Sequence, residues 1–140
     1  MKGQSSFELL ISFGVVLAFT VPVLFLLLSV TSIGYEDASK AQADATARTL
    51  ADTMNSVYAQ GPGAQREILL NAPVSTQDIY VSNGEVVVRI KTANGDFDAV
   101  APTIAKIHSS PDSIGSKTGL FRVTVAAIQN GDQVEVDISD

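Results

Sequence analysis

The 140-residue chain has no cysteine and no tryptophan, and its single histidine is His108. Without cysteine there can be no disulfide, thiolate metal site or catalytic thiol, and one histidine is too few for a histidine-based metal cluster. The 9 basic residues form no run and are outnumbered by 15 acidic ones, which gives a net charge of −6. Because nucleic-acid binding needs clustered positive charge, we expect no nucleic-acid partner.

Motifs for catalysis are also lacking. Asp96 and Asp98 follow a turn, but their order does not fit a calcium-binding loop. Gly61-Pro62-Gly63 lacks the Gly-Lys-Ser/Thr end of a phosphate-binding loop, and no Gly-x-Ser-x-Gly nucleophile elbow accompanies His108. We therefore predict that the protein is not an enzyme and takes neither a cofactor nor a metal.

One long segment is free of charge. From Leu9 to Tyr35, 27 consecutive residues include no Asp, Glu, Lys or Arg. As a helix this run measures about 40 Å, and about 20 apolar residues suffice to span a bilayer. Pro22 predicts a bend in this helix, and Gly34 marks a second place where it can bend. An ordinary secretory signal, with its apolar core of about 7–15 residues, is the weaker interpretation.

The flanking charges give this helix an orientation. Lys2 precedes the run, and Glu36 and Asp37 follow it. The positive-inside rule then places the N-terminus in the cytoplasm and the chain beyond residue 36 outside. Glu8 stands at the start of the run, either as an interfacial acid favoured by the helix dipole or as a group that meets a cationic partner after assembly.

The first residues also resemble a known family. Residues 2–8, Lys-Gly-Gln-Ser-Ser-Phe-Glu, lead directly into Leu9-Leu10-Ile11. This start resembles the class III signal peptide of archaeal type IV pilin-like proteins with a Gln-Ser-x-x-Glu-type mature start. The motif covers about the first 11 residues, and the resemblance extends along the helix to about residue 60. It implies that a prepilin peptidase cuts between Gly3 and Gln4, so that residues 1–3 are a cleaved leader.

Cleavage at that bond would create a new cation at the α-amino group of Gln4. In a bundle of identical helices, Glu8 of one subunit can pair with the Gln4 amine of its neighbour, which neutralises two charges that are costly to bury alone. The pair would also fix the axial stagger between subunits, and the resemblance implies the same role. We expect apolar side chains of residues 4–35 to pack the bundle core, among them Phe7, Leu10, Phe13, Leu17 and Leu24.

The resemblance implies a structural subunit, major or minor, of an archaeal type IV pilus-like surface filament, a class of filament associated with cell adhesion. Its partners would be copies of itself or related pilins, the prepilin peptidase and, indirectly, the assembly platform and ATPase. The precursor would lie in the cytoplasmic membrane and the mature subunit in an extracellular filament. The alternative is a single-pass, membrane-anchored surface binding module that does not polymerise; an archaellum filament protein is a weaker alternative.

Residues 36–60 predict an amphipathic continuation of the helix. A stripe with 4-3-4-3 spacing lies on one face, with charged residues opposite, and Gly61-Pro62-Gly63 ends the helix. The stripe consists of Ala43, Ala47, Leu50, Met54 and Val57. We expect it to pack on the protein's own globular domain; a parallel coiled coil is less favoured because an alanine-rich seam is thin.

Beyond residue 60 the apolar period changes to two, which is typical of strands. Asn83-Gly84, Asn94-Gly95 and Asn130-Gly131 predict turns, residues 66–70, 97–101, 104–108, 120–128 and 133–138 predict strands, and residues 109–118 predict a loop. The fold class is therefore α+β, with a long helix over about residues 6–60 followed by a small antiparallel head, a sheet or sandwich, over residues 61–140. The predicted core of the head is Ile68, Leu70, Ile79, Val81, Val86, Val88, Ile90, Phe97, Ile104, Phe121, Val123, Val125, Val134, Val136 and Ile138.

Overall fold

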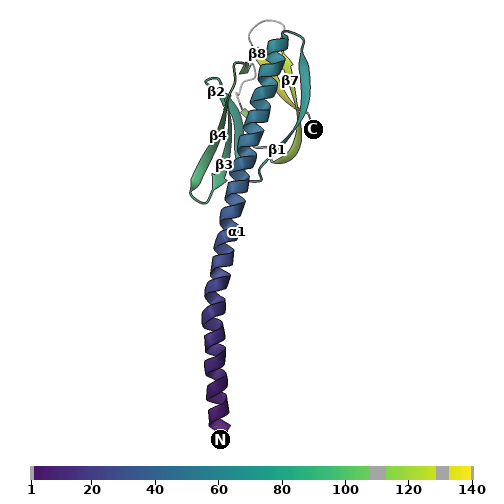
Figure 1. Ribbon diagram of the computed structural model, residues 1–140. Helices are drawn as coiled ribbons and strands as arrows, with labels where there is room; N and C mark the ends of the chain where they lie inside the picture. The colour runs from purple at the N-terminus through teal and green to yellow at the C-terminus, as the bar shows by residue number, and fades with distance from the viewer. Residues whose placement is uncertain (1, 108–112, 129–132, 140) are drawn as a thin grey trace. The chain divides into compact units, whose positions relative to one another are not determined.

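The structure, a computed structural model, describes residues 2–107, 113–128 and 133–139 (Figure 1). One long helix is followed by two small sheets, an α+β architecture as the sequence predicts. The chain divides into two compact units, Met1–Tyr35 and Glu36–Asp140. The division falls where the uncharged segment ends.

The helix α1 extends over Lys2–Gln60 and is uninterrupted at Pro22 and Gly34. It begins four residues before the predicted start at residue 6, and its end agrees with the prediction. Gly61 ends it in the left-handed region, with φ of 86°, and the amide of Gly61 donates to the carbonyl of Tyr58 (3.1 Å). Glycine takes this conformation without the steric cost that other residues incur.

The strands after the helix form two four-stranded sheets. The first, which we call sheet A, has the order β1-β7-β8-β5, and the second, sheet B, has the order β4-β3-β2-β6. The bounds are Gln65–Ala72 for β1, Thr76–Ser82 for β2, Glu85–Thr92 for β3, Gly95–Pro102 for β4, Lys106–Ile107 for β5, Ser113–Gly115 for β6, Gly119–Ala127 for β7 and Gln133–Ser139 for β8.

Two of the predicted turns can be compared with the structure. Ser82 pairs with Glu85, so that Asn83 (φ 53°) and Gly84 (φ 79°) form the predicted two-residue hairpin loop. The second loop is shifted by one residue, because Gly95 already pairs with Thr92. Ala93 and Asn94 form that loop instead. The third predicted turn, Asn130-Gly131, lies outside the described residues.

Three predictions for the head are wrong. Among the described residues of the strand expected over 104–108, only Lys106–Ile107 form a strand, and it pairs with β8 in parallel. Ile104, assigned to the core, is 68% exposed. The side chain of Asn55 explains both differences, since its Oδ1 accepts hydrogen bonds from the Thr103 hydroxyl and the Ile104 amide, each at 2.9 Å, and so holds this segment on the helix instead of in a sheet.

The third error concerns the loop predicted over residues 109–118. Residues 113–115 form the short strand β6, which pairs with β2. The hydroxyl of Ser113 donates to Oδ1 of Asp78 and accepts from the amide of Gly115 (3.0 Å), so polar side-chain contacts replace an apolar pattern there. His108 and residues 109–112 lie outside the described residues.

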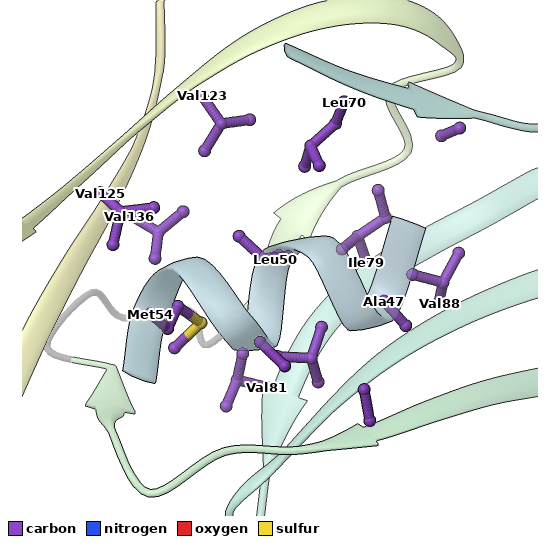
Figure 2. Packing of buried hydrophobic residues seen from close by; sticks show 14 of the residues in the cluster. Ala47, Leu50, Met54, Leu70, Ile79, Val81, Val88, Val123, Val125 and Val136 are labelled. Carbon is purple, nitrogen blue, oxygen red and sulfur yellow. The ribbon is translucent and has the colours of Figure 1, made fainter. Parts of the chain in front are cut away.

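The core lies where the two sheets meet the second half of α1. The five residues of the predicted helical stripe are all buried, at most 1% exposed, and the stripe therefore packs on the protein's own head. Figure 2 shows Leu50 and Met54 facing Val123, Val125 and Val136 of sheet A, with Val81 of sheet B on the other side. Ile68 and Phe97 are only partly buried against this core, and Ile138 lies in β8.

Polar side chains attach the helix to both sheets. The amide of Gln42 donates to the carbonyl of Asn71 at the end of β1 (3.0 Å), and the hydroxyl of Thr46 lies 2.9 Å from the same oxygen. On the other side, the Ala93 amide between β3 and β4 donates to Glu36 Oε1 (2.9 Å). Figure 1 shows β2, β3 and β4 on one side of this part of α1 and β1 and β7 on the other.

Candidate functional site

The most distinctive surface of the chain is the apolar part of α1. It is long and apolar enough to cross a membrane, and none of its most apolar stretch is buried within the protein. A core helix of a soluble protein would be largely covered by its own fold, as residues 43–57 are here. By length and composition this segment could cross a membrane, and exposing so much apolar area to water is unfavourable.

The five residues predicted to pack a bundle core all belong to this exposed surface. Their exposed fractions range from 44% to 68%, in Phe7, Leu10, Phe13, Leu17 and Leu24. At 100° per residue they fall within about one third of the helix circumference. The structure thus places them on one side of the helix, but a single chain brings no partner to them.

Five hydroxyl groups in the apolar segment donate hydrogen bonds to carbonyl groups of their own helix. Ser12 donates to the carbonyl of Glu8, Thr20 to that of Val16 and Ser29 to that of Phe25, at 2.8–3.0 Å. Thr31 and Ser32 do the same with Leu27 and Ser29. Such bonds remove the cost of carrying a hydroxyl into lipid or into a packed apolar core. These five hydroxyl groups are therefore compatible with an apolar environment.

Gln4 and Glu8 lie one turn apart in the helix, which spaces them by about 6 Å along its axis and places them on one face. Both side chains are exposed, and within the part of the chain that the structure describes Glu8 has no ion pair. By rotation, this face lies away from the side formed by the five packing residues. The predicted cleavage site between Gly3 and Gln4 lies in the first turn of the helix.

The head offers little for chemistry. One hollow in the head, of about 530 Å³, is lined by the β2–β3 turn and residues 104–107. Lys106 is the one ionisable side chain among the described residues that line it, so the hollow has no acid–base pair of the kind that proton transfer uses. Over the described ranges, no group of three or more Asp, Glu, His or Cys residues is placed to hold a metal.

Comparisons with known proteins do not add to this picture. No family model matches the chain, and neither a curated protein nor a solved structure matches it. The function is therefore inferred from the residues and the geometry above.

The structure also reveals apolar residues on the outside of the head to which the sequence pattern assigned no role. Leu69 and Leu120 are 56% and 70% exposed, and Val100 is 42% exposed. The alternation of strand residues could have predicted their exposure. Leu69, Leu120 and Val100 each lie next in sequence to a buried residue, namely Leu70, Phe121 and Ala101. Only the inward-facing set was predicted, because the alternation alone identifies a core and not an outer contact.

Proposed function

We propose that this protein is a structural subunit, a major or minor pilin, of an archaeal type IV pilus-like surface filament. The observation that carries the proposal is the uncovered apolar helix of residues 4–35, joined to the Gly3-Gln4 and Glu8 pattern at its start. In the filament the helices of many copies form the core and the heads face outward. The protein is not an enzyme.

Burial of the helix stabilises the filament relative to a subunit exposed to water. Moving a Leu or Phe side chain from an exposed to a buried position contributes about 1.5–3 kcal/mol, and this helix carries many such side chains in exposed positions. The membrane supplies an equivalent environment before assembly, so the precursor is held there with its head outside. Because lipid is as apolar as the side chains, packing and polar pairs must decide between membrane and filament.

Glu8 is the polar group whose pairing can favour the filament over the membrane. In a filament core, a carboxylate without a partner costs several kcal/mol, whereas a close ion pair with the Gln4 α-amine of a neighbouring subunit offsets much of that cost. Only one axial offset between two helices brings these groups together. Cleavage by a prepilin peptidase after Gly3 is the step that would create the amine.

The test is to shear surface filaments from cells that produce the protein and to determine its N-terminus by mass spectrometry. We expect a chain that starts at Gln4 in the filament fraction. Recovery from membranes only, with an N-terminus at Met1, would contradict the proposal and favour the anchored binding module. A processed chain that stays in the membrane fraction would support cleavage but refute polymerisation.

A further inference from the structure

One end of the head unit is fixed close to the membrane boundary by the covalent chain. Glu36 is the first residue of this unit and directly follows Tyr35, the last residue of the uncharged run. That run measures about 40 Å as a helix, and a bilayer with its headgroups is about 40–45 Å thick. In the membrane-bound subunit Glu36 therefore lies at the outer headgroup layer, and any tilt of the helix brings it deeper into that layer.

The β3–β4 loop is held at Glu36. The amide of Ala93 donates to Glu36 Oε1 at 2.9 Å, and Ala93 and Asn94 are both exposed. Because a glutamate side chain reaches only a few ångströms, the loop lies within one side-chain length of the depth of Glu36. It therefore meets the headgroup layer whatever the tilt of the helix.

A second loop adjoins this end of the head and carries an exposed apolar side chain. Val74 lies in a tight turn, in which the amide of Thr76 donates to the carbonyl of Pro73 (3.0 Å). The amide of Lys91 donates to the carbonyl of Ser75 (2.8 Å), which attaches the turn to β3 near the β3–β4 loop. Val74 is 90% exposed, the most of any large apolar residue in the part of the chain that the structure describes. A single exposed valine is ordinary on a protein surface, but this one lies within reach of the headgroups.

The charged side chains around the two loops are of both signs. Glu36, Asp37 and Asp96 are acids, and Lys40 and Lys91 are cations, so that three acids against two lysines give a net of −1. Lys40 approaches Glu36 at 4.0 Å, and Lys91 is the cross-strand partner of Asp96. Binding to an anionic membrane surface uses a cluster of basic residues, and these five residues do not form one. A mixture of both signs instead suits a zwitterionic headgroup, which carries a phosphate and an amine.

We infer that residues 73–75 and 93–94, which we call the membrane-proximal surface, rest on zwitterionic lipid headgroups of the outer leaflet while the subunit is held in the membrane. The exposed Lys91 donates to a headgroup phosphate, and the exposed Asp37 attracts the cationic group. Val74 loses contact with water at the same surface. The inference rests on the membrane stage of the proposed function and adds a lipid contact of the head to the anchor formed by the helix.

The lack of tryptophan in the chain allows a direct test, because a single introduced tryptophan reports only its own surroundings. Val74→Trp and Asn94→Trp are introduced separately into the full-length chain. Each variant is reconstituted in phosphatidylcholine vesicles in which a minor part of the lipid carries a nitroxide on its headgroup. The nitroxide quenches tryptophan emission on close approach. We expect a strong loss of emission from both variants, relative to the same vesicles without nitroxide.

Two control variants calibrate the depth. Gln60→Trp lies at an exposed position, and the helix rises about 36 Å from Glu36 to Gln60, so its emission should fall far less. Leu26→Trp lies inside the apolar run and should be quenched more by a nitroxide on the acyl chain than by one on the headgroup. Replacing part of the phosphatidylcholine by anionic phosphatidylglycerol should weaken the quenching of Asn94→Trp, because this end of the head is itself acidic.

The outcomes separate the lipid contact from the proposed function. If Leu26→Trp is quenched from the acyl chain but each folded loop variant behaves like Gln60→Trp, the headgroup contact is overturned and the membrane anchor stands. Equal quenching of Gln60→Trp and the loop variants would also overturn it, since the head would then show no preference for this end. Stronger quenching of Asn94→Trp in anionic vesicles would overturn the assignment to zwitterionic headgroups.

A Leu26→Trp variant that is not quenched from the acyl chain would show that the helix does not insert. The membrane stage of the proposed function then fails, and the headgroup contact fails with it. Two loop variants are used because either substitution alone could disturb its turn.

Discussion

The backbone amide of Ala93 donates a hydrogen bond of 2.9 Å to the carboxylate of Glu36, the first residue of the head unit. Lys40, one turn further along the helix, approaches the other oxygen of Glu36 at 4.0 Å and lies 5.8 Å from the centroid of the Phe97 ring. The start of the head unit is thus fastened to the β3–β4 hairpin by one acid and one cation.

Replacement of Glu36 by Gln should loosen this hairpin. A hydrogen bond to a charged group contributes about 1.5–3 kcal/mol, but Glu36 is partly exposed, so we expect a loss in the lower part of that range or below it. Hydrogen exchange of the Ala93 amide in the detergent-solubilised chain should accelerate. Asp37→Asn, at the exposed neighbouring position, is the control; equal acceleration in both variants would contradict the assignment.

The core of the head should depend strongly on Leu50. Its side chain is completely buried between the two sheets, and Leu→Ala in such positions costs about 2–5 kcal/mol. Leu120→Ala removes the same atoms from a side chain that is 70% exposed and should cost less than about 0.5 kcal/mol in the isolated subunit. Denaturant unfolding of both variants in detergent compares the two losses, and similar losses would refute the assigned packing.

The ion pair between Arg89 and Asp98 should make the free energy of unfolding depend on pH in the acidic range. Hydrogen bonds from Arg89 hold the pKa of Asp98 below its ordinary value, which is about 3.9 in the unfolded chain. The unfolded state therefore binds the proton first, so the stabilisation is complete above about pH 3.9 and is lost as the pH falls through the folded-state pKa.

The measurement compares wild type with Asp98→Asn from pH 7 to pH 2. The difference in stability should be constant near neutrality and vanish in acid, and it should be small because both groups are partly exposed. Asp96→Asn serves as control, since Asp96 makes no hydrogen bond to Arg89 among the described contacts. A difference that grows as the pH falls would contradict a lowered pKa of Asp98 in the folded state.

Most of the fold follows from local patterns in the sequence. The stripe through Leu50 and Met54 and the inward residues of β3 alternate with the periods of a helix and a strand, and the structure buries them as predicted. The register of a long, regular strand is strongly determined, because shifting the strand by one residue would expose its whole apolar face.

The errors fall where a single polar contact decides the path of the chain. The side chain of Asn55 accepts hydrogen bonds from Thr103 and Ile104, which lie 48 and 49 residues away in sequence. No local sequence pattern predicts these two contacts. The short strand β6 likewise depends on Ser113 meeting Asp78. For the candidate site, the sequence identified the apolar helix and the position of Glu8, whereas the outer surfaces of the head needed the strand register.

Substitutions at Gly84 and Gly61 should separate two destabilising effects, the strain of a positive φ and the steric clash of an added Cβ. Gly84 and Gly61 both have positive φ, of 79° and 86°, which costs other residues about 1–2 kcal/mol. A Cβ on Gly84 would also lie 3.2 Å from the Thr103 carbonyl oxygen, whereas one on Gly61 would meet nothing within 4 Å. Gly84→Ala should therefore lower the unfolding midpoint more than Gly61→Ala. Equal shifts would show that the backbone conformation alone sets the penalty.

Glu8 should be needed for assembly and not for membrane insertion. Replacing it by Leu removes an acid from the start of an apolar helix, which favours insertion into lipid. In the proposed filament the same change leaves the α-amine of a neighbouring Gln4 unpaired in an apolar core, a loss of about 3–5 kcal/mol when one member of a buried pair is removed. We therefore expect normal amounts of Glu8→Leu in membranes and a large loss from the sheared filament fraction.

Two further variants show what the carboxylate contributes in the Glu8 experiment. Glu8→Gln keeps the size and polarity of the side chain but removes its charge, so it should also fail to assemble if pairing with an amine is the reason. Ser12→Ala removes a hydroxyl that bonds only within its own helix, to the carbonyl of Glu8 (2.9 Å), and should assemble normally. A normal filament yield from Glu8→Leu would refute the role of Glu8 in setting the stagger, because no other acid lies within the first 35 residues to replace it.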